Sequence, residues 1–201
     1  MITSYCLIRD RTIILNGEKI FSDGRSIDDF LVNAYMAKGI NYPKYYKMDN
    51  LSKLGFLACE LMLGGRVLAD EYSPTTVAVV LSNAHASLDT DLKYAQTAKS
   101  MGSPALFVYT LSNIVAGEIC IRHKIKGENA FFVTPRFDAH LLVDYVGTLN
   151  EQVQCVVCGW VDVMDQHHDV FLYLIEKNKN TPLQHAAEQL MKIYNTPLWN
   201  S

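Results

Sequence analysis

The 201-residue sequence contains no long apolar run and no strong excess of charge of either sign. A membrane-spanning helix needs roughly 20 consecutive apolar residues, and no stretch approaches that length, so we predict no membrane span. Lys and Arg number 18 against 21 Asp and Glu, which argues against the basic surface that nucleic-acid binding requires. The segment after Met1 lacks the charged and apolar regions of a secretory signal. Five scattered cysteines, an odd number, are typical of reduced thiols, and we therefore expect a cytoplasmic protein.

The sequence also lacks a complete metal or redox motif. Cys155 and Cys158 form a C-x-x-C pair, but they lie in an apolar run typical of a buried strand, and no second pair accompanies them. A redox pair normally precedes a helix, whose dipole lowers the thiol pKa, and no helix signal follows Cys158. His167 and His168 lie among aspartates, a pattern that favours a solvated loop over a metal site. We predict no metal and no cofactor.

No catalytic motif is complete either. Ser82, His85 and Asp89 are the residue types of a hydrolase triad, but the G-x-S-x-G nucleophile elbow is missing. His140 stands at the start of a predicted helix, where a structural role is typical. The motifs of the sequence, taken alone, therefore point to no enzyme activity.

Alternating strand and helix patterns predict an α/β fold. Apolar runs indicate strands, and a helical period bounded by capping residues indicates helices. Strands are expected as two short segments between 1 and 21, then over 76–81, 130–134, 154–163 and 169–176, with an extended segment over 103–109. Helices are expected over 26–38, 50–63, 89–101, 113–124, 138–149 and about 182–194. This alternation favours a largely parallel or mixed sheet covered on both faces, in a single domain over 1–201 with a core of about 12–176.

One long motif runs from Ser103 to Arg136. It contains a Ser-Pro-Ala-Leu-Phe-Val segment, then Asn113, an Ala-Gly pair, a Lys-Gly-Glu-Asn turn and a strand that ends at Thr134. This spacing resembles the β-ketoacyl synthase family without a gap, and further segments match in order from about Thr12 to Glu176. Ser-Leu-Asp-Thr-Asp at 87–91 is similar to synthase-like proteins of aryl polyene and flexirubin pigment pathways. The resemblance implies the N-terminal, thiolase-like half of that fold: a mixed, mostly parallel five-stranded sheet with helices on both faces.

Departures from the family pattern bear on activity. The family's nucleophilic cysteine falls on Arg136, and a guanidinium cannot accept an acyl group. The second-half segments that carry the family's two active-site histidines have no match in this sequence. The resemblance therefore implies a chain without condensing activity of its own. If a partner subunit buries Arg136, the charge needs an anionic partner, and Asp138 and Asp144 are candidates.

A chain-length factor is the function that this resemblance implies. Such a subunit pairs with a full-length β-ketoacyl synthase and shapes its acyl tunnel in fatty-acid or polyketide-type synthesis. By resemblance the pairing strand is 130–134. The residues that the resemblance assigns to the tunnel or the interface are Ala105, Leu106, Phe107, Tyr109, Phe131, Phe132, Val133, Thr134 and Phe137. Arg122, Lys124 and Lys126 are candidates for docking an acidic acyl carrier protein, with a solvated helix face as the alternative.

Two other interpretations stay open. The chain is alternatively a self-contained homodimer that binds an acyl chain or small ligand without a synthase partner. A third interpretation is an enzyme with new chemistry that uses Arg136, Asp138 and His140.

Overall fold

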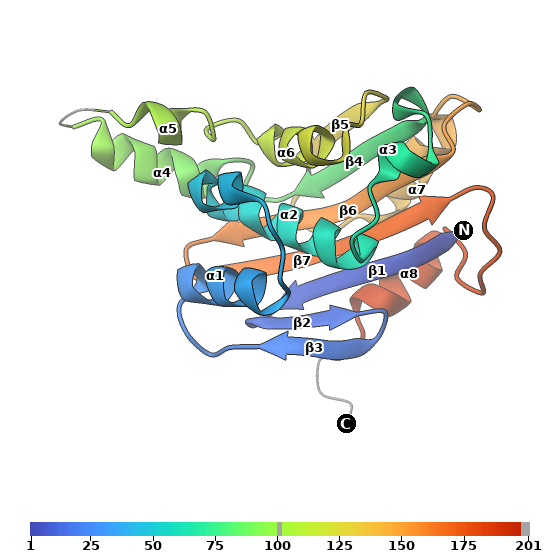
Figure 1. Ribbon diagram of the computed structural model, residues 1–201, viewed down its shortest axis with the longest axis horizontal. Helices are drawn as coiled ribbons and strands as arrows, with labels where there is room; N and C mark the ends of the chain where they lie inside the picture. The colour runs from blue at the N-terminus through green and yellow to red at the C-terminus, as the bar shows by residue number, and fades with distance from the viewer. Residues whose placement is uncertain (100–101, 198–201) are drawn as a thin grey trace.

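Figure 1 shows a mixed β-sheet through the middle of the molecule, with helices on both sides. The structure is a computed structural model that describes residues 1–99 and 102–197. Within those residues the sheet has seven strands in the order β3-β2-β1-β7-β6-β4-β5. The strands are β1 (Ile2–Arg9), β2 (Thr12–Leu15), β3 (Glu18–Ser22), β4 (Val77–Asn83), β5 (Asn129–Val133), β6 (Cys155–Met164) and β7 (His167–Glu176). The helices are α1 (Ile27–Ala37), α2 (Asn50–Leu63), α3 (Leu68–Glu71), α4 (Leu88–Thr97), α5 (Pro104–Phe107), α6 (Ile114–His123), α7 (Ala139–Thr148) and α8 (Ala187–Tyr194), with 3-10 turns η1 (Pro43–Lys47) and η2 (Pro74–Thr76).

The sheet is more antiparallel than the sequence pattern predicts. β4 pairs in parallel with β5 and β6, whereas the pairs β3–β2, β2–β1, β1–β7 and β7–β6 are antiparallel. The α/β class and the cover on both faces are confirmed, and the expectation of five mostly parallel strands is corrected. Short connections between strands explain part of the difference. Asn16 and Gly17 form a tight turn between β2 and β3, with φ angles of 52° and 90°. A turn this short can join only antiparallel neighbours.

Helix ends follow the capping residues in the sequence. Asp49 accepts a hydrogen bond from the Ser52 N–H at 2.9 Å and starts α2, and Gly64 ends it in the left-handed region at φ 59°. Asp138 caps α7 in the same way, through the Leu141 N–H at 3.0 Å. The predicted helices over 50–63 and 138–149 are therefore confirmed.

Two segments differ from the prediction. The stretch 103–109, expected to be extended, contains the short helix α5, which the Ser103 hydroxyl caps by accepting from the Leu106 N–H at 3.3 Å. The last helix starts at Ala187 and not near Pro182, because the segment before it is tied in extended form to β1. The Ile2 N–H donates to the Leu183 carbonyl at 2.9 Å. The predicted helix over 89–101 is present as α4, and its last two expected residues lie outside the described part.

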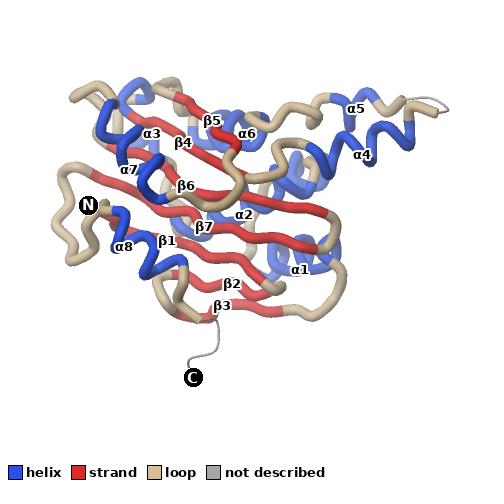
Figure 2. The backbone as a smooth tube through the Cα atoms, turned by 180° about the vertical axis from the view of Figure 1, so that it is seen from behind, coloured by secondary structure: helices blue, strands red, loops and turns tan. Residues whose placement is uncertain are grey.

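Separate apolar clusters cover the two faces of the sheet. α1, α2 and α6 pack on the face seen in Figure 1, and α7 and α8 pack on the opposite face, seen in Figure 2. Thirteen of the fourteen residues of α2 are buried, so α2 is the central helix of its layer. No helix among the described residues has the length and apolarity to cross a bilayer.

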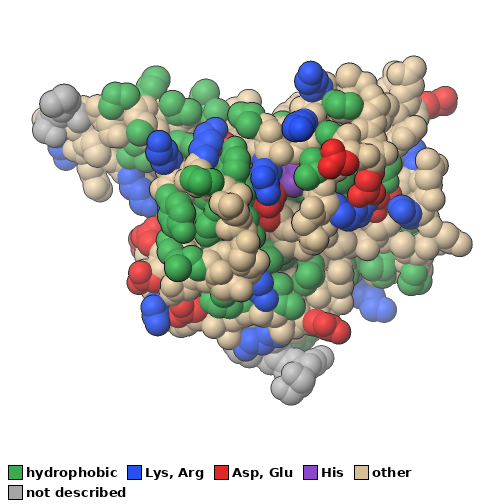
Figure 3. All heavy atoms as spheres, in the orientation of Figure 1, with side chains coloured by type: hydrophobic (Ala, Val, Ile, Leu, Met, Phe, Trp, Pro, Cys, Tyr) green, Lys and Arg blue, Asp and Glu red, His purple; other side chains and the backbone are tan. Residues whose placement is uncertain are grey.

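An arm formed by α4 and α5 projects from one end of the body (Figure 1). It carries large hydrophobic side chains that are 42–60% exposed, and Figure 3 shows hydrophobic side chains along it. These residues are Leu88, Leu92, Phe107, Val108 and Leu111. Monomeric proteins rarely expose contiguous apolar patches of large size, so the arm is suited to contact with another surface.

Candidate functional site

The loop between β5 and α7 contains the position that the resemblance assigns to the nucleophile. Phe137 anchors this loop: it is 5% exposed and stacks on Tyr194 with ring centroids 4.4 Å apart. Thr134 donates its hydroxyl to the Arg136 carbonyl at 2.9 Å, and Asp138 caps the helix. The backbone is thus fixed on both sides of Arg136, two residues before the N-cap of α7. The expected tunnel residue Phe137 lies inside the chain's own core.

Arg136 is exposed, and its guanidinium makes no ion pair with any residue that the structure describes. Neither Asp138 nor Asp144 serves as its partner. A helix N-terminus carries partial positive charge and stabilises a thiolate. A guanidinium there has the opposite preference.

The five cysteines all lie outside this loop. Cys6, Cys59, Cys155 and Cys158 are buried, and Cys120 is half-buried on α6. Burial raises the pKa of all five thiols, to about 12 for Cys155 and Cys158. Because the thiolate is the reactive form, burial disfavours reaction at these cysteines.

β5 forms one edge of the sheet. Phe132 packs on Tyr145 of α7 with ring centroids 4.9 Å apart, and Phe131 packs on the opposite face. Val133 is 56% exposed. An edge with exposed apolar side chains and free backbone groups favours pairing with another strand.

An apolar pocket of about 220 Å³ lies between α5, η1 and α6. We call it the arm pocket, and its lining residues are Lys44, Lys47, Ala105, Val108, Tyr109 and Glu118. The structure thus brings two expected tunnel residues, Ala105 and Tyr109, to one cavity. Leu106 and Phe107 do not line it. Phe107 instead contacts Tyr94 of the arm, with ring centroids 5.4 Å apart.

The three basic candidates for carrier-protein docking differ in their surroundings. Arg122 makes two hydrogen bonds of 3.0 Å to Glu60 and lies 5.3 Å from the ring centre of Tyr42. Lys124 and Lys126 are exposed at the end of α6. Arg122 is therefore held by Glu60, whereas Lys124 and Lys126 form no ion pair with any residue that the structure describes.

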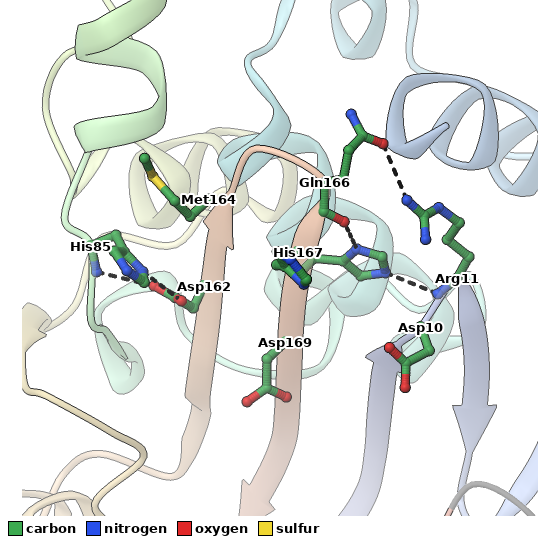
Figure 4. Close-up of a pocket in the computed structure, with 9 residues that line it drawn as sticks. Asp10, Arg11, His85, Asp162, Met164, Gln166, His167 and Asp169 are labelled. Carbon is green, nitrogen blue, oxygen red and sulfur yellow. Dashed lines mark hydrogen bonds and ion pairs between the residues drawn. The ribbon is translucent and has the colours of Figure 1, made fainter. Parts of the chain in front are cut away.

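A second, polar pocket of about 380 Å³ lies where β1, β4 and β6 end (Figure 4). His85 Nδ1 lies 2.9 Å from the Asp162 carboxylate, which also accepts the backbone N–H groups of Ala84 and His85. His168 accepts from the Arg11 N–H at 3.1 Å, and burial lowers its pKa. His85 thus pairs with Asp162.

The hydrolase triad considered from the sequence does not form. Ser82 is buried and donates to the Gly159 carbonyl at 3.3 Å, and Asp89 pairs with Lys93 at 2.7 Å. Among the described residues no three His, Cys, Asp or Glu side chains are placed to hold a metal ion.

Sequence reasoning missed the polar part of the arm pocket. Glu118 is buried on α6, where Lys44 contacts it at 2.8 Å and the Tyr109 hydroxyl donates to it at 3.1 Å. A glutamate inside an otherwise apolar helical stretch was the available signal, because buried carboxylates require partners. The partners are distant in sequence, and no local pattern identifies them.

Comparisons with known proteins give the fold. No protein-family model and no curated protein matches the sequence. Among solved structures, the ketosynthase ApeO in complex with its chain length factor ApeC from Xenorhabdus doucetiae matches with a TM-score of 0.58 and 12% identity, over 89% of this chain and 79% of that one. AntDE:AntF, a type II PKS acyl-carrier protein in complex with its ketosynthase bound to the hexaketide, matches with a TM-score of 0.57 and 14% identity, over 94% of this chain and 64% of that one. The chain therefore has the thiolase-like fold found in these ketosynthase complexes.

Proposed function

We propose that the chain is a non-catalytic ketosynthase-like subunit, a chain-length factor, that pairs with an active β-ketoacyl synthase and shapes its acyl tunnel. One observation carries the proposal: an exposed Arg136 occupies the turn before α7, where the resemblance puts the acyl-accepting thiol. The buried cysteines elsewhere supply no thiolate. In this proposal residues 1–201 act as one domain in the cytoplasm. The pathway is of fatty-acid or polyketide type, such as aryl polyene or flexirubin synthesis.

The two edges of the sheet support a particular mode of pairing. The outer strand β3 exposes Glu18 and Lys19 and has a register shift against β2, and charges and irregularities of this kind oppose edge-to-edge pairing. β5 at the other edge carries Phe131, Phe132 and Val133. A partner strand is therefore expected at β5.

Hydrogen bonds fix which backbone groups of β5 are available to a partner. Thr134 N–H donates to the Asn83 carbonyl, and Val79 N–H donates to the Glu128 carbonyl, both at 2.9 Å. Since alternate residues of a strand point their backbone groups to the same side, even-numbered groups face β4. The backbone groups of Phe131 and Val133 therefore face the free edge.

The arm supports the tunnel role. Its apolar side chains Phe107, Val108 and Leu111 are exposed in the single chain, and the arm pocket lies beside them. A partner that covers the arm would enclose this pocket. Lys124 and Lys126 remain candidates for contact with an acidic carrier protein.

The same edge and pocket also fit the second candidate, a homodimer that binds an acyl chain or small ligand by itself. The two candidates differ in the partner and agree on β5 as the interface. The partner must therefore be identified by experiment.

Co-expression with a full-length synthase from the same genome tests the proposal. We expect a stable 1:1 complex that Val133→Pro abolishes, because proline removes the outward N–H while the inward ladder to β4 remains. Val133→Ala keeps that N–H and is the matched control. A self-associated chain that captures no synthase would support the homodimer. A monomer without affinity for synthase would rule out both candidates.

A further inference from the structure

The arm pocket has walls of distinct chemistry. Ala105, Val108 and Tyr109 contribute an apolar wall, and Tyr109 is 6% exposed with its hydroxyl turned to Glu118. Val108 is 52% exposed although it faces this cavity. An apolar group that entered the pocket would cover surface that is now in contact with water, which is favourable.

The charges at the rim favour an anion. Glu118 is 4% exposed, and Lys44 contacts it at 2.8 Å as an ion pair that lacks hydrogen-bond alignment. Lys47 is exposed and has no ion-pair partner within residues 1–99 and 102–197. Two lysines against one glutamate leave one positive charge at the rim, and that charge belongs to Lys47.

The volume of the pocket limits the size of an apolar tail. A cavity of about 220 Å³ corresponds to about seven units of the ~30 Å³ that a water molecule occupies in the liquid. A methylene group is of similar size. A tail of about six to eight carbons therefore fits, and a longer one would extend beyond the arm.

We infer that the arm pocket binds a medium-chain carboxylate, with its tail on Ala105, Val108 and Tyr109 and its carboxylate at Lys47. This inference deepens the proposed function, since it names the chemistry of a ligand on the arm and gives it a headgroup site. Binding requires no synthase partner.

Saturation-transfer difference NMR with sodium octanoate on the full chain tests the inference. We expect saturable binding at one site, with octanol about fivefold weaker because it lacks the charge, and no saturable binding of octylammonium. Ala105→Phe should fill the pocket and weaken octanoate binding at least about tenfold, since one methylene in such a site already changes binding by about tenfold or more. Lys47→Gln should weaken it about fivefold.

Lys179→Gln is the matched control, because Lys179 is an exposed lysine outside the pocket, and we expect less than about a twofold change. Absent saturation, equal binding of octylammonium, or unchanged affinity in Ala105→Phe would each overturn the inference. Circular dichroism confirms that each variant is folded. Octanoate binding without synthase capture would leave this inference standing and remove the proposed function, and synthase capture without octanoate binding would do the reverse.

Discussion

We expect Glu176→Gln to lower the free energy of unfolding at pH 7 by about 2 kcal/mol. Glu176 ends β7 with a side chain that is 1% exposed. Arg66 donates to it at 2.7 Å, the Tyr72 hydroxyl donates at 2.5 Å, and the Thr3 hydroxyl also donates. These contacts join β7 to β1 and α3, so the carboxylate links three elements that are distant in sequence.

The pKa of Glu176 determines the magnitude and the pH window. Burial opposes ionisation, but the hydrogen bonds from Arg66, Thr3 and Tyr72 outweigh it, and the pKa falls from 4.5 to about 2. This difference is worth ~3 kcal/mol at 1.36 kcal/mol per pH unit. Because Arg66 is 33% exposed, solvent screening reduces the value to about 2 kcal/mol. A lowered pKa means that the stabilisation is present above pH 4.5 and is lost as the pH falls toward 2.

Urea denaturation of wild type and variant at pH 7, 4.5 and 2.5 measures this effect. The difference between the two proteins should shrink as the pH falls, because the wild-type carboxylate becomes protonated. Glu71→Gln is the control, since Glu71 accepts a hydrogen bond from the same Arg66 at 2.7 Å but is exposed. We expect this variant to lower the free energy of unfolding by less than about 0.5 kcal/mol. A constant difference across this pH range would refute the reasoning.

Two further substitutions test the fold and the absent chemistry. Gly159→Ala should prevent folding, because the added Cβ would lie 2.0 Å from the Phe171 carbonyl oxygen and the backbone φ there is 147°. Gly117→Ala is the control, because a Cβ at Gly117 meets open space, and we expect it to be neutral or to stabilise the fold by up to about 1 kcal/mol. Thermal denaturation measures both variants, and a folded Gly159→Ala protein would contradict the geometry. Arg136→Cys should give no condensation with acyl and malonyl thioesters, since no segment of the 201 residues resembles the family's histidine segments. Its exposed thiol should still react with iodoacetamide faster than the native cysteines, four of which are buried and one of which, Cys120, is half-buried. Measurable condensation by this variant would show that the chain contains a complete active site.

Local signals explain which elements the sequence predicts well. α2 lies where expected because Asp49 and Gly64 mark its ends within the local sequence. The sequence predicts an extended segment at α5 because six apolar residues are too few to separate a strand period from a helical one. The Ser103 cap and the contact of Phe107 with Tyr94 stabilise the helical form of this segment.

The number and direction of the strands depend on short turns as well as on distant contacts. β3 is short and polar, and it becomes a strand because it pairs with β2. The arm pocket likewise depends on Lys44 and Glu118, which lie on separate elements and meet only in the folded chain. The sequence supplied two residues of its apolar wall through the family resemblance, and it gave no sign of the charges.

Arg136 gives the proposal a test in which two measurements must move in opposite directions. In the single chain its positive charge lies near the positive end of the α7 dipole without an anionic partner among the described residues, so Arg136→Ala should raise the stability of the chain slightly, by about 0.3 kcal/mol. In a complex through β5, the adjacent loop approaches the partner, and a guanidinium there would be retained only if it meets a carboxylate or carbonyl group. The same substitution should then weaken the complex by about 1 kcal/mol or more. Thermal denaturation and a synthase titration measure the two effects. A substitution that leaves both unchanged would make Arg136 a neutral replacement for the thiol, without a role in the interface.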